Sequence, residues 1–181
     1  LEAAGIPFQS LRGTDTGVWV GASVMEYLAA QAGAPGALTP FSNPGIALCV
    51  IANRVSFFLG VRGPSMAVDT ACASSLTALD LAVQAIRSGR CDMAIVGGTN
   101  NPMMPDLSVG YTQMGVMAPD GQCKPFDARA NGYARAEGYG CIVLKRLDLA
   151  RRDANPLLAL VRACRSNANG DLSTGLSKPS A

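Results

Sequence analysis

The fold of this chain is decided by one stretch, Ala67-Val68-Asp69-Thr70-Ala71-Cys72-Ala73-Ser74-Ser75-Leu76. A short apolar run that ends at Val68 predicts a β-strand, and the polar pair Asp69 and Thr70 predicts a sharp turn after it. A helix is then predicted from Cys72 to about Ile86, with apolar residues on nearly every face, as in helices that are buried on most sides. Side-chain hydrogen bonds from Asp69 and Thr70 are expected to hold the turn.

The segments around this stretch alternate between strand and helix patterns. Gly89 can take the left-handed conformation that ends a helix, and the next apolar run predicts a strand. Strands are predicted at 16–23, 66–68, 91–96, 139–144 and 157–164, and helices at 24–32, 44–56, 72–86, 107–114 and 147–152. Residues 115–132 and 165–181 are predicted to be loops, the first of them functional because long loops in compact domains usually are. This alternation predicts an α/β protein with a mainly parallel sheet.

Cys72 is a candidate nucleophile because of where it lies and what surrounds it. Its neighbours Ala71, Ala73 and Ser74 are small, so another molecule can approach the sulfur. At the start of a helix, unpaired N–H groups and the helix dipole favour a thiolate and can stabilise an oxyanion. Free cysteine is also among the most buried residue types, so position alone leaves a core thiol as the alternative.

Composition excludes several other kinds of chemistry. The 181 residues include 15 basic and 13 acidic side chains, for a net charge of +2, and no polybasic run that would suggest nucleic acid or a membrane surface as a partner. The six cysteines occur singly, a pattern typical of reduced thiols in a cytoplasmic protein. The chain has no histidine, so Cys-His or Ser-His catalysis within it is excluded, and neither a metal nor a cofactor site is predicted.

The central stretch resembles the active-site signature of the β-ketoacyl synthase (ketosynthase) family, in particular the ketosynthase domains of type I polyketide synthases and animal-type fatty acid synthases. Other motifs of the family follow in the same order along most of the chain. They are Asn53-Arg54-Val55-Ser56-Phe57-Phe58, Arg62-Gly63-Pro64-Ser65, Ala94-Ile95-Val96-Gly97-Gly98, Pro119-Asp120-Gly121-Gln122-Cys123-Lys124-Pro125-Phe126-Asp127, Asn131-Gly132-Tyr133 and Glu137-Gly138.

The resemblance implies a thiolase-like fold, a layered α-β-α-β-α arrangement of two similar halves. Residues 1–181 would form most of the first, N-terminal half, as a partial ketosynthase domain truncated at both ends. We expect the missing half to supply two catalytic histidines, so the isolated chain is expected to be inactive.

The resemblance also implies a mechanism. Cys72 would take an acyl group from the phosphopantetheine arm of an acyl carrier protein, with its own backbone N–H as one oxyanion donor. A malonyl-type extender would then lose CO₂ and attack the acyl thioester. Met114 and Met117 are candidates to line an acyl channel, although methionine is equally suited to core filling. The resemblance further implies a homodimer that forms through residues 65–69 and a location in the cytoplasm. Neither nucleic acid nor a membrane is expected as a partner.

Two alternatives remain open from the sequence. One is a thiolase-type, non-decarboxylating condensing enzyme, and the other is a non-catalytic half-domain that serves as a dimerisation or interaction module.

A further expectation concerns four charged residues that could form an ion-pair network behind the long loop: Asp127, Arg129, Arg135 and Glu137.

Overall fold

A central β-sheet organises the computed structural model, which describes residues 1–23, 26–33, 36 and 38–170. Within these residues the sheet has four strands in the order β2-β1-β3-β4. They are β1 (Gly17–Gly21), β2 (Ser65–Val68), β3 (Met93–Asn100) and β4 (Gly138–Lys145). β1 is parallel to both β2 and β3, whereas β4 is antiparallel to β3. The predicted α/β class and the mainly parallel sheet are therefore confirmed.

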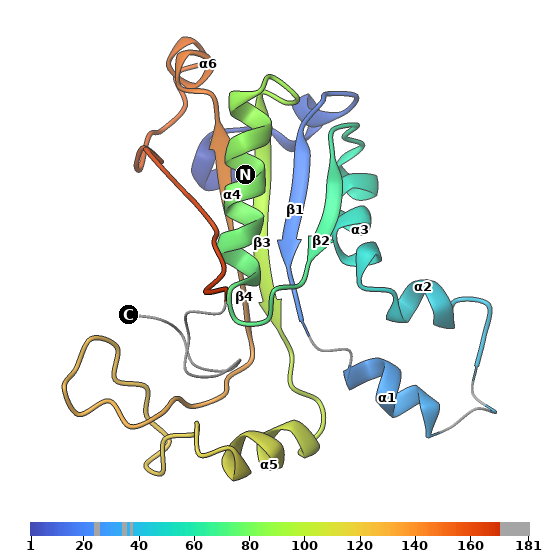
Figure 1. Cartoon of the computed structure of the whole chain (residues 1–181). Coiled ribbons are helices and arrows are strands. Elements are labelled where there is room, and N and C mark those ends of the chain that lie inside the picture. Colours follow the sequence, from blue (N-terminus) through green and yellow to red (C-terminus); the bar gives the residue numbers. More distant parts are fainter. Residues whose placement is uncertain (24–25, 34–35, 37, 171–181) are drawn as a thin grey trace.

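Helices connect and cover these strands (Figure 1). The α-helices of the described residues are α1 (Glu26–Ala32), α2 (Ser42–Ile46), α3 (Cys49–Leu59), α4 (Ser74–Arg87), α5 (Asp106–Gln113) and α6 (Leu147–Arg152). Two short 3₁₀ helices, η1 (Glu2–Ala4) and η2 (Phe8–Leu11), precede β1. Of the predicted helix at 24–32, residues 24 and 25 lie outside the described residues. No α-helix in the described part of the chain is long and apolar enough to cross a membrane.

The sheet separates two apolar layers because successive residues of a strand point to opposite faces. Val18 and Val20 face η1, η2 and α3, whereas Trp19 between them faces α4. The layer on the α3 side contains Ile6, Leu11, Ala52, Leu59, Met93 and Ile95. The layer on the α4 side contains Ala78, Ala82, Ala85, Cys91, Ala94 and Val96. α1, α5 and the long loop after α5 lie beyond the carboxyl ends of the parallel strands (Figure 1).

Helix α4 is less buried than its sequence predicted. Its alanines pack against the sheet, but Leu76 is 66% exposed and Leu81 is 37% exposed. The prediction that α4 is buried on most sides is therefore wrong for the face that carries these leucines. The predicted left-handed residue after the helix is confirmed, since Gly89 has a φ of 71°.

The helix predicted at 44–56 is in fact two helices. α2 ends at Ile46 because Ala47 takes an extended backbone conformation, with ψ at 121°, and α3 begins only at Cys49. Gly45 contributes to this break, because glycine is a weak helix former. α3 then continues three residues past the predicted end and stops at Gly60, whose φ of 69° is left-handed.

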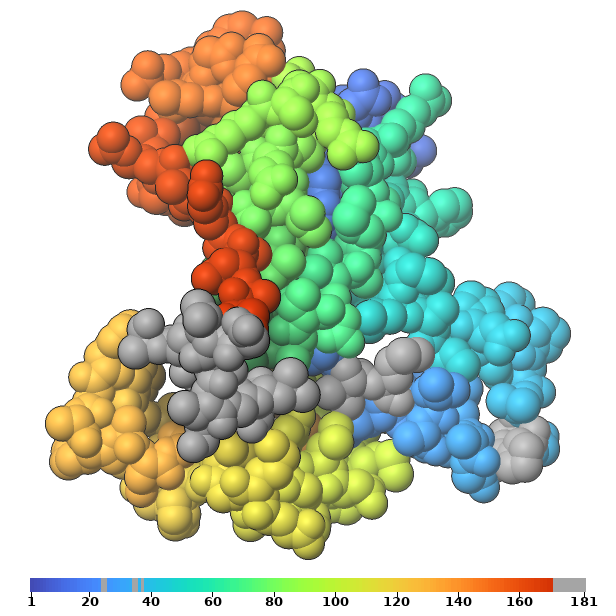
Figure 2. Space-filling model, in the orientation of Figure 1, coloured from blue at the N-terminus to red at the C-terminus, as the bar shows by residue number. Residues whose placement is uncertain are grey.

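The strand predicted at 157–164 is absent. This segment has no regular structure, and Leu158 is 91% exposed. The segment is bound to α4 instead of the edge of β4: the Arg87 guanidinium donates to the carbonyl of Arg162 at 2.6 Å, and the Cys164 thiol donates to the carbonyl of Leu76 at 3.8 Å. Figure 2 shows the segment lying along α4. Of the predicted loop at 165–181, residues 165–170 lack regular structure and the remainder lies outside the described residues.

Candidate active site at the turn before helix α4

Cys72 lies in the turn between β2 and α4. The helix begins at Ser74, so the prediction that it starts at Cys72 is wrong by two residues. The thiol is free and exposed, in contrast to Cys91, which is buried. Cys72 is therefore an exposed residue at the carboxyl end of the parallel strands and does not belong to either apolar layer of the sheet.

Short side chains hold this turn in place, as predicted for Asp69 and Thr70. Asp69 Oδ1 accepts a hydrogen bond from the Ala71 N–H at 3.0 Å, and the hydroxyls of Thr70 and Thr77 are 2.9 Å apart. Ser74 Oγ accepts from the Thr70 N–H at 2.9 Å and donates to the Ala71 carbonyl at 2.5 Å. The start of α4 is thereby tied to both residues that precede Cys72.

The backbone of the turn is strained at one residue. Ala71 has a φ of 51°, a left-handed conformation that costs a residue with a side chain on the order of 1–3 kcal/mol. Strain of this kind is often found at functional sites. Among the hydrogen bonds of the described turn, none is donated by the Cys72 N–H, so this group is available to an oxygen atom of a bound molecule.

Two glycines bring the strand ends into contact with this turn. A Cβ atom at Gly21, the last residue of β1, would lie 2.4 Å from the Ser75 nitrogen, closer than real Cβ contacts allow. At Gly98, in β3, a Cβ would lie 3.1 Å from the Ser75 side chain. The sequence analysis did not single out Gly21, although a glycine at the end of a predicted strand is a signal of close backbone approach.

The two ends of the long loop after α5 are joined through Tyr133. The Tyr133 N–H donates to Val116 and its carbonyl accepts from Ala118. Gly132 permits this contact, because a Cβ there would lie 2.5 Å from the Ala118 nitrogen. Burial raises the pKa of Tyr133.

The structure places the two candidate channel residues differently. Met117 is half-buried and forms a bridge with Tyr133 where the two ends of the long loop meet. Met114 lies at the end of α5 and is 63% exposed. No contact joins either side chain to Cys72 among the described residues, so the acyl channel stays a prediction.

The charged residues of the loop form separate pairs and not one network. Asp127 binds Arg129 at 2.7 Å. Arg135 instead pairs with Glu26 of α1 at 3.1 Å, and both side chains are almost fully buried. The sequence analysis missed Glu26, because a contact between residues so far apart leaves no local pattern.

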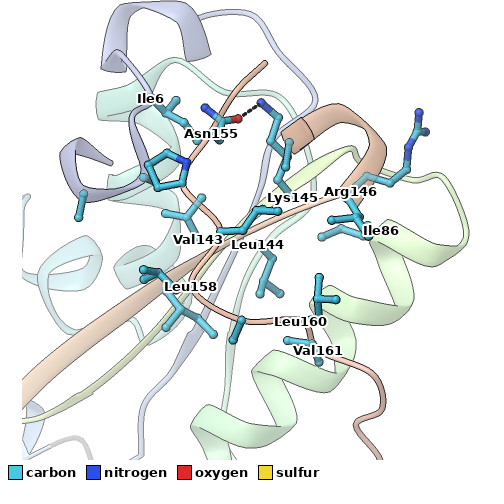
Figure 3. A pocket seen from close by; sticks show the side chains of 18 of the residues that line it. Ile6, Ile86, Val143, Leu144, Lys145, Arg146, Asn155, Leu158, Leu160 and Val161 are labelled. Carbon is cyan, nitrogen blue, oxygen red and sulfur yellow. Dashed lines mark hydrogen bonds between the residues drawn. The ribbon is translucent and has the colours of Figure 1, made fainter. Parts of the chain in front are cut away.

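A cavity among the described residues lies away from Cys72. It has a volume of about 530 Å³ and is lined by β4, the end of α4, η1 and residues 155–161 (Figure 3). Because β4 is antiparallel to β3, the Lys145 end of β4 lies beside the start of β3, at the opposite end of the sheet from the Cys72 turn. The described residues contain no group of three or more His, Cys, Asp or Glu side chains that could hold a metal ion.

Comparison with known proteins agrees with this architecture. Residues 1–150 match the family model described as "Beta-ketoacyl synthase, N-terminal domain". The chain is 47% identical over 180 residues to a phenolphthiocerol/phthiocerol polyketide synthase of Mycobacterium tuberculosis, covering 99% of this chain and 10% of that protein. It is 41% identical over 181 residues to a highly reducing polyketide synthase of a Cryptosporiopsis species, covering 100% of this chain and 8% of that protein.

Solved structures of ketosynthases are also similar. The ketosynthase from module 6 of the bacillaene synthase of Bacillus subtilis 168 aligns with a TM-score of 0.75 at 36% identity, over 86% of this chain and 26% of that one.

The sheet, its two helical layers and the exposed thiol at a strand-to-helix turn are those of a thiolase-like fold. The chain belongs to the β-ketoacyl synthase family, and its relatives are polyketide synthases. It spans about a tenth of the length of the curated relatives that it matches and about a quarter of the solved ketosynthase chains.

Proposed function

We propose that residues 1–181 are the N-terminal half of a ketosynthase domain of a polyketide synthase, and that Cys72 is its acyl-accepting nucleophile. The observation that carries this proposal is the exposed, free Cys72 thiol, held in a strained and hydrogen-bonded turn before α4. Family membership and the polyketide synthase relatives support a ketosynthase over a thiolase-type enzyme.

In the first step the Cys72 thiolate attacks the carbonyl carbon of an acyl thioester on the phosphopantetheine arm of an acyl carrier protein. A C–S bond to Cys72 forms, and the bond to the pantetheine sulfur breaks. The pantetheine thiolate leaves and takes up a proton. The free Cys72 N–H supports a role as one donor to the oxyanion that develops on the carbonyl oxygen.

In the second step a malonyl-type thioester loses CO₂, and its enolate attacks the acyl carbonyl on Cys72. A C–C bond forms and the Cys72 thiolate is released, giving a β-ketoacyl product. The 181 residues contain no histidine, so proton transfer in this step falls to groups outside them, and the isolated chain is not expected to complete the condensation. No cofactor or metal is invoked beyond the carrier-bound phosphopantetheine.

We further propose a homodimer through β2 and a cytoplasmic location. β2 is the last strand on its side of the described sheet, so its outer edge is open to pair with a second copy. The free state of all six cysteines is compatible with a reducing compartment.

Met117 is the better placed of the two candidate channel residues, because it lies beside Tyr133.

The test is acyl loading on the full-length protein, measured by mass spectrometry of proteolytic peptides after incubation with an acyl thioester. We expect the acyl group on the peptide that contains Cys72, and complete loss of loading in Cys72→Ala. Cys49→Ala is the matched control, because Cys49 is also a free and exposed thiol. Acyl transfer that survives Cys72→Ala would contradict the proposed function.

A further inference from the structure

Residues 101–137 leave the sheet and return to it at neighbouring points. Asn100 at the end of β3 pairs with Gly138 at the start of β4, so the two ends of the segment lie side by side. The Asn100 side chain also donates to the Ala136 carbonyl at 2.7 Å. The segment, which contains α5 and the long loop, lies beyond the carboxyl ends of the parallel strands (Figure 1). A segment with adjacent ends can move as a body without breaking the sheet.

Contacts inside the segment connect its parts to one another. The rings of Tyr111 in α5 and Tyr133 have centroids 6.4 Å apart and planes inclined by 61°, the edge-to-face arrangement that aromatic pairs favour. The Lys124 ammonium pairs with Asp120 at 2.7 Å and donates to Asn131 at 2.7 Å. α5, the middle of the loop and its end are therefore joined independently of the sheet.

Packing of the segment against the rest of the fold is sparse. It contributes no residue to the two apolar layers of the sheet. Within 101–137 only Ala118 is fully buried, and α5 buries no residue. Met103, Val109 and Met114 are each more than half exposed. Segments with so few buried apolar contacts open at a lower free energy than the core does.

The hydrogen bonds that tie the segment to the rest of the described fold converge on Glu26 of α1. Apart from the contact that joins its two ends, each of these bonds has the Glu26 carboxylate as acceptor. The N–H groups of Met103 and Met104 donate to Oε2, the latter at 2.6 Å, and Arg135 donates to Oε1 at 3.1 Å. One carboxylate thus binds both the start and the end of the segment.

The ion pair between Glu26 and Arg135 is shielded from water. Only 6% of the Glu26 side chain and 9% of the Arg135 side chain are exposed. Arg135 also donates to Ser108 at 2.8 Å, and its guanidinium carbon lies 5.5 Å from the centre of the Tyr111 ring. The hydrogen bond from Met104 is the main cause that lowers the pKa of Glu26, against the opposing effect of burial. The carboxylate is therefore ionised at neutral pH.

A cavity lies between the segment and the rest of the fold. It has a volume of about 200 Å³ and is lined by α1, α2, the start of α3 and the ends of β1 and β3 on one side, and by Asn101 and Met103 of the segment on the other. Atoms that line a cavity lose attractive contacts on one side. The bonds to Glu26 therefore provide a larger share of the attachment here than they would in a filled interface.

We propose that residues 101–137 form a lid over the carboxyl ends of the strands, that the lid opens as one unit about its adjacent ends, and that Glu26 holds it closed. Ligands of α/β proteins bind at the carboxyl ends of parallel strands, so a lid there is suited to admit and enclose one. Opening returns both charges of the ion pair to water, whereas removal of one partner leaves the other buried and uncompensated. This inference does not depend on the proposed role of Cys72.

Hydrogen–deuterium exchange of the full-length protein, followed by mass spectrometry of peptides, tests the lid. In the unmodified protein, amides of 101–137 should exchange faster than those of β1 and β3. Glu26→Gln should raise exchange throughout the lid by about 100-fold, as expected when one member of a buried ion pair is lost, and leave β1 and β3 unchanged. Cleavage by trypsin after Lys124, whose side chain is 16% exposed, should rise in parallel, because cleavage follows the population of the open form.

Two further variants separate the role of Glu26 from local effects. Asp127→Asn is the matched control, because it breaks an ion pair with Arg129 inside the lid and no bond to α1. It should leave exchange in the rest of the lid unchanged. Arg135→Lys keeps the charge but loses the planar fork, so it should act in the same direction as Glu26→Gln, and it serves if that variant does not fold.

Three results would overturn the proposal. The first is lid exchange that neither Glu26→Gln nor Arg135→Lys raises, or that Asp127→Asn raises equally. The second is exchange that rises equally in the lid and in β1 and β3, because the ion pair would then support the fold as a whole. The third is a rise confined to the residues next to Glu26, because the segment would then not open as one unit.

Discussion

At the scale of single residues, the position of the Cys72 thiol is set mainly by backbone contacts. Gly21 lets the end of β1 touch the first turn of α4, and Ser74 ties that turn to Thr70 and Ala71. No large side chain intervenes between strand and helix at this point of the described chain. Catalytic groups must be held to within fractions of an ångström, and main-chain contact of this kind is suited to that.

Gly21→Ala should disturb this arrangement. The added methyl group would meet the backbone of Ser75, which cannot rotate away, so we expect unfolding free energy to fall by about 1–3 kcal/mol. The start of α4 should also shift, and acyl transfer to Cys72 should slow by at least about tenfold, since small misplacements of reacting groups cost about 100-fold. Thermal denaturation and acyl-loading rates measure both effects.

Gly97→Ala is the matched control for this change. A Cβ at Gly97 would make only ordinary contacts, the nearest at 3.5 Å. Both the stability and the loading rate should then remain close to those of the unmodified protein. Equal effects of the two substitutions would show that close approach at Gly21 is unimportant.

The sequence predicts a site residue when the pattern that marks it lies within a few neighbouring residues. Cys72, Asp69 and Thr70 were found because strand, turn and helix patterns are local. Glu26 and Arg135 could not be paired from the sequence, because their contact depends on how α1 and the long loop fold back over the strand ends.

At the scale of elements, prediction was accurate where local patterns and packing agree. α6 spans the predicted residues, and the bounds of β4, β1 and β3 lie within one, two and four residues of the predicted ones, respectively. The predicted strand at 157–164 fails because an apolar run shows only that a segment can be buried. Whether it pairs with β4 depends on partners elsewhere, and the segment instead forms hydrogen bonds with Arg87 and Leu76 of α4.

A charged cluster fastens α6 to β4. Asp153 accepts from Lys145 at 2.7 Å and from Arg152 at 2.8 Å, and Lys145 also donates to Asn155 at 2.6 Å, as Figure 3 shows. Hydrogen bonds from Arg152 and then Lys145 lower the pKa of Asp153 from 3.8 to about 2. Because this pKa is lowered in the folded state, the cluster stabilises the fold fully above pH 3.8 and loses its effect as pH falls toward 2.

Asp153→Asn should therefore lower the melting temperature at neutral pH, and the difference from the unmodified protein should narrow between about pH 4 and pH 2. Thermal melts across this pH range check the prediction. A difference that stays constant down to pH 2 would mean that the Asp153 carboxylate makes no contribution to stability.

At the scale of the whole molecule, the sheet formed by the described residues has an open edge at β2. The Val18 N–H donates to the carbonyl of Pro64, and the Ala22 N–H donates to that of Val68. In a parallel ladder this pattern turns the N–H and C=O groups of the residues in between, Ser65 and Ala67, away from β1. These outward groups are available to a second β2 strand.

Ala67→Pro should consequently convert the homodimer that we propose for the complete ketosynthase domain to monomers. Proline removes the outward N–H of Ala67 and leaves the hydrogen bonds to β1 in place. Ala67→Val, which retains the N–H, should remain dimeric. Light scattering coupled to size-exclusion chromatography measures the mass, and circular dichroism verifies that both variants are folded. A dimer that persists in Ala67→Pro would place the interface elsewhere.

The glycine contacts at the ends of β1 and β3 also bear on how such proteins diversify. These contacts position the Cys72 turn through β1, β3 and α4. Met117 and Tyr133 lie on the long loop, which is bound to α1 by the ion pair between Arg135 and Glu26. Mutations in that loop leave the backbone contacts of the Cys72 turn in place. The turn and the loop can therefore evolve separately, and a loop exchanged between relatives would need its ion-pair partner at position 26 to be exchanged with it.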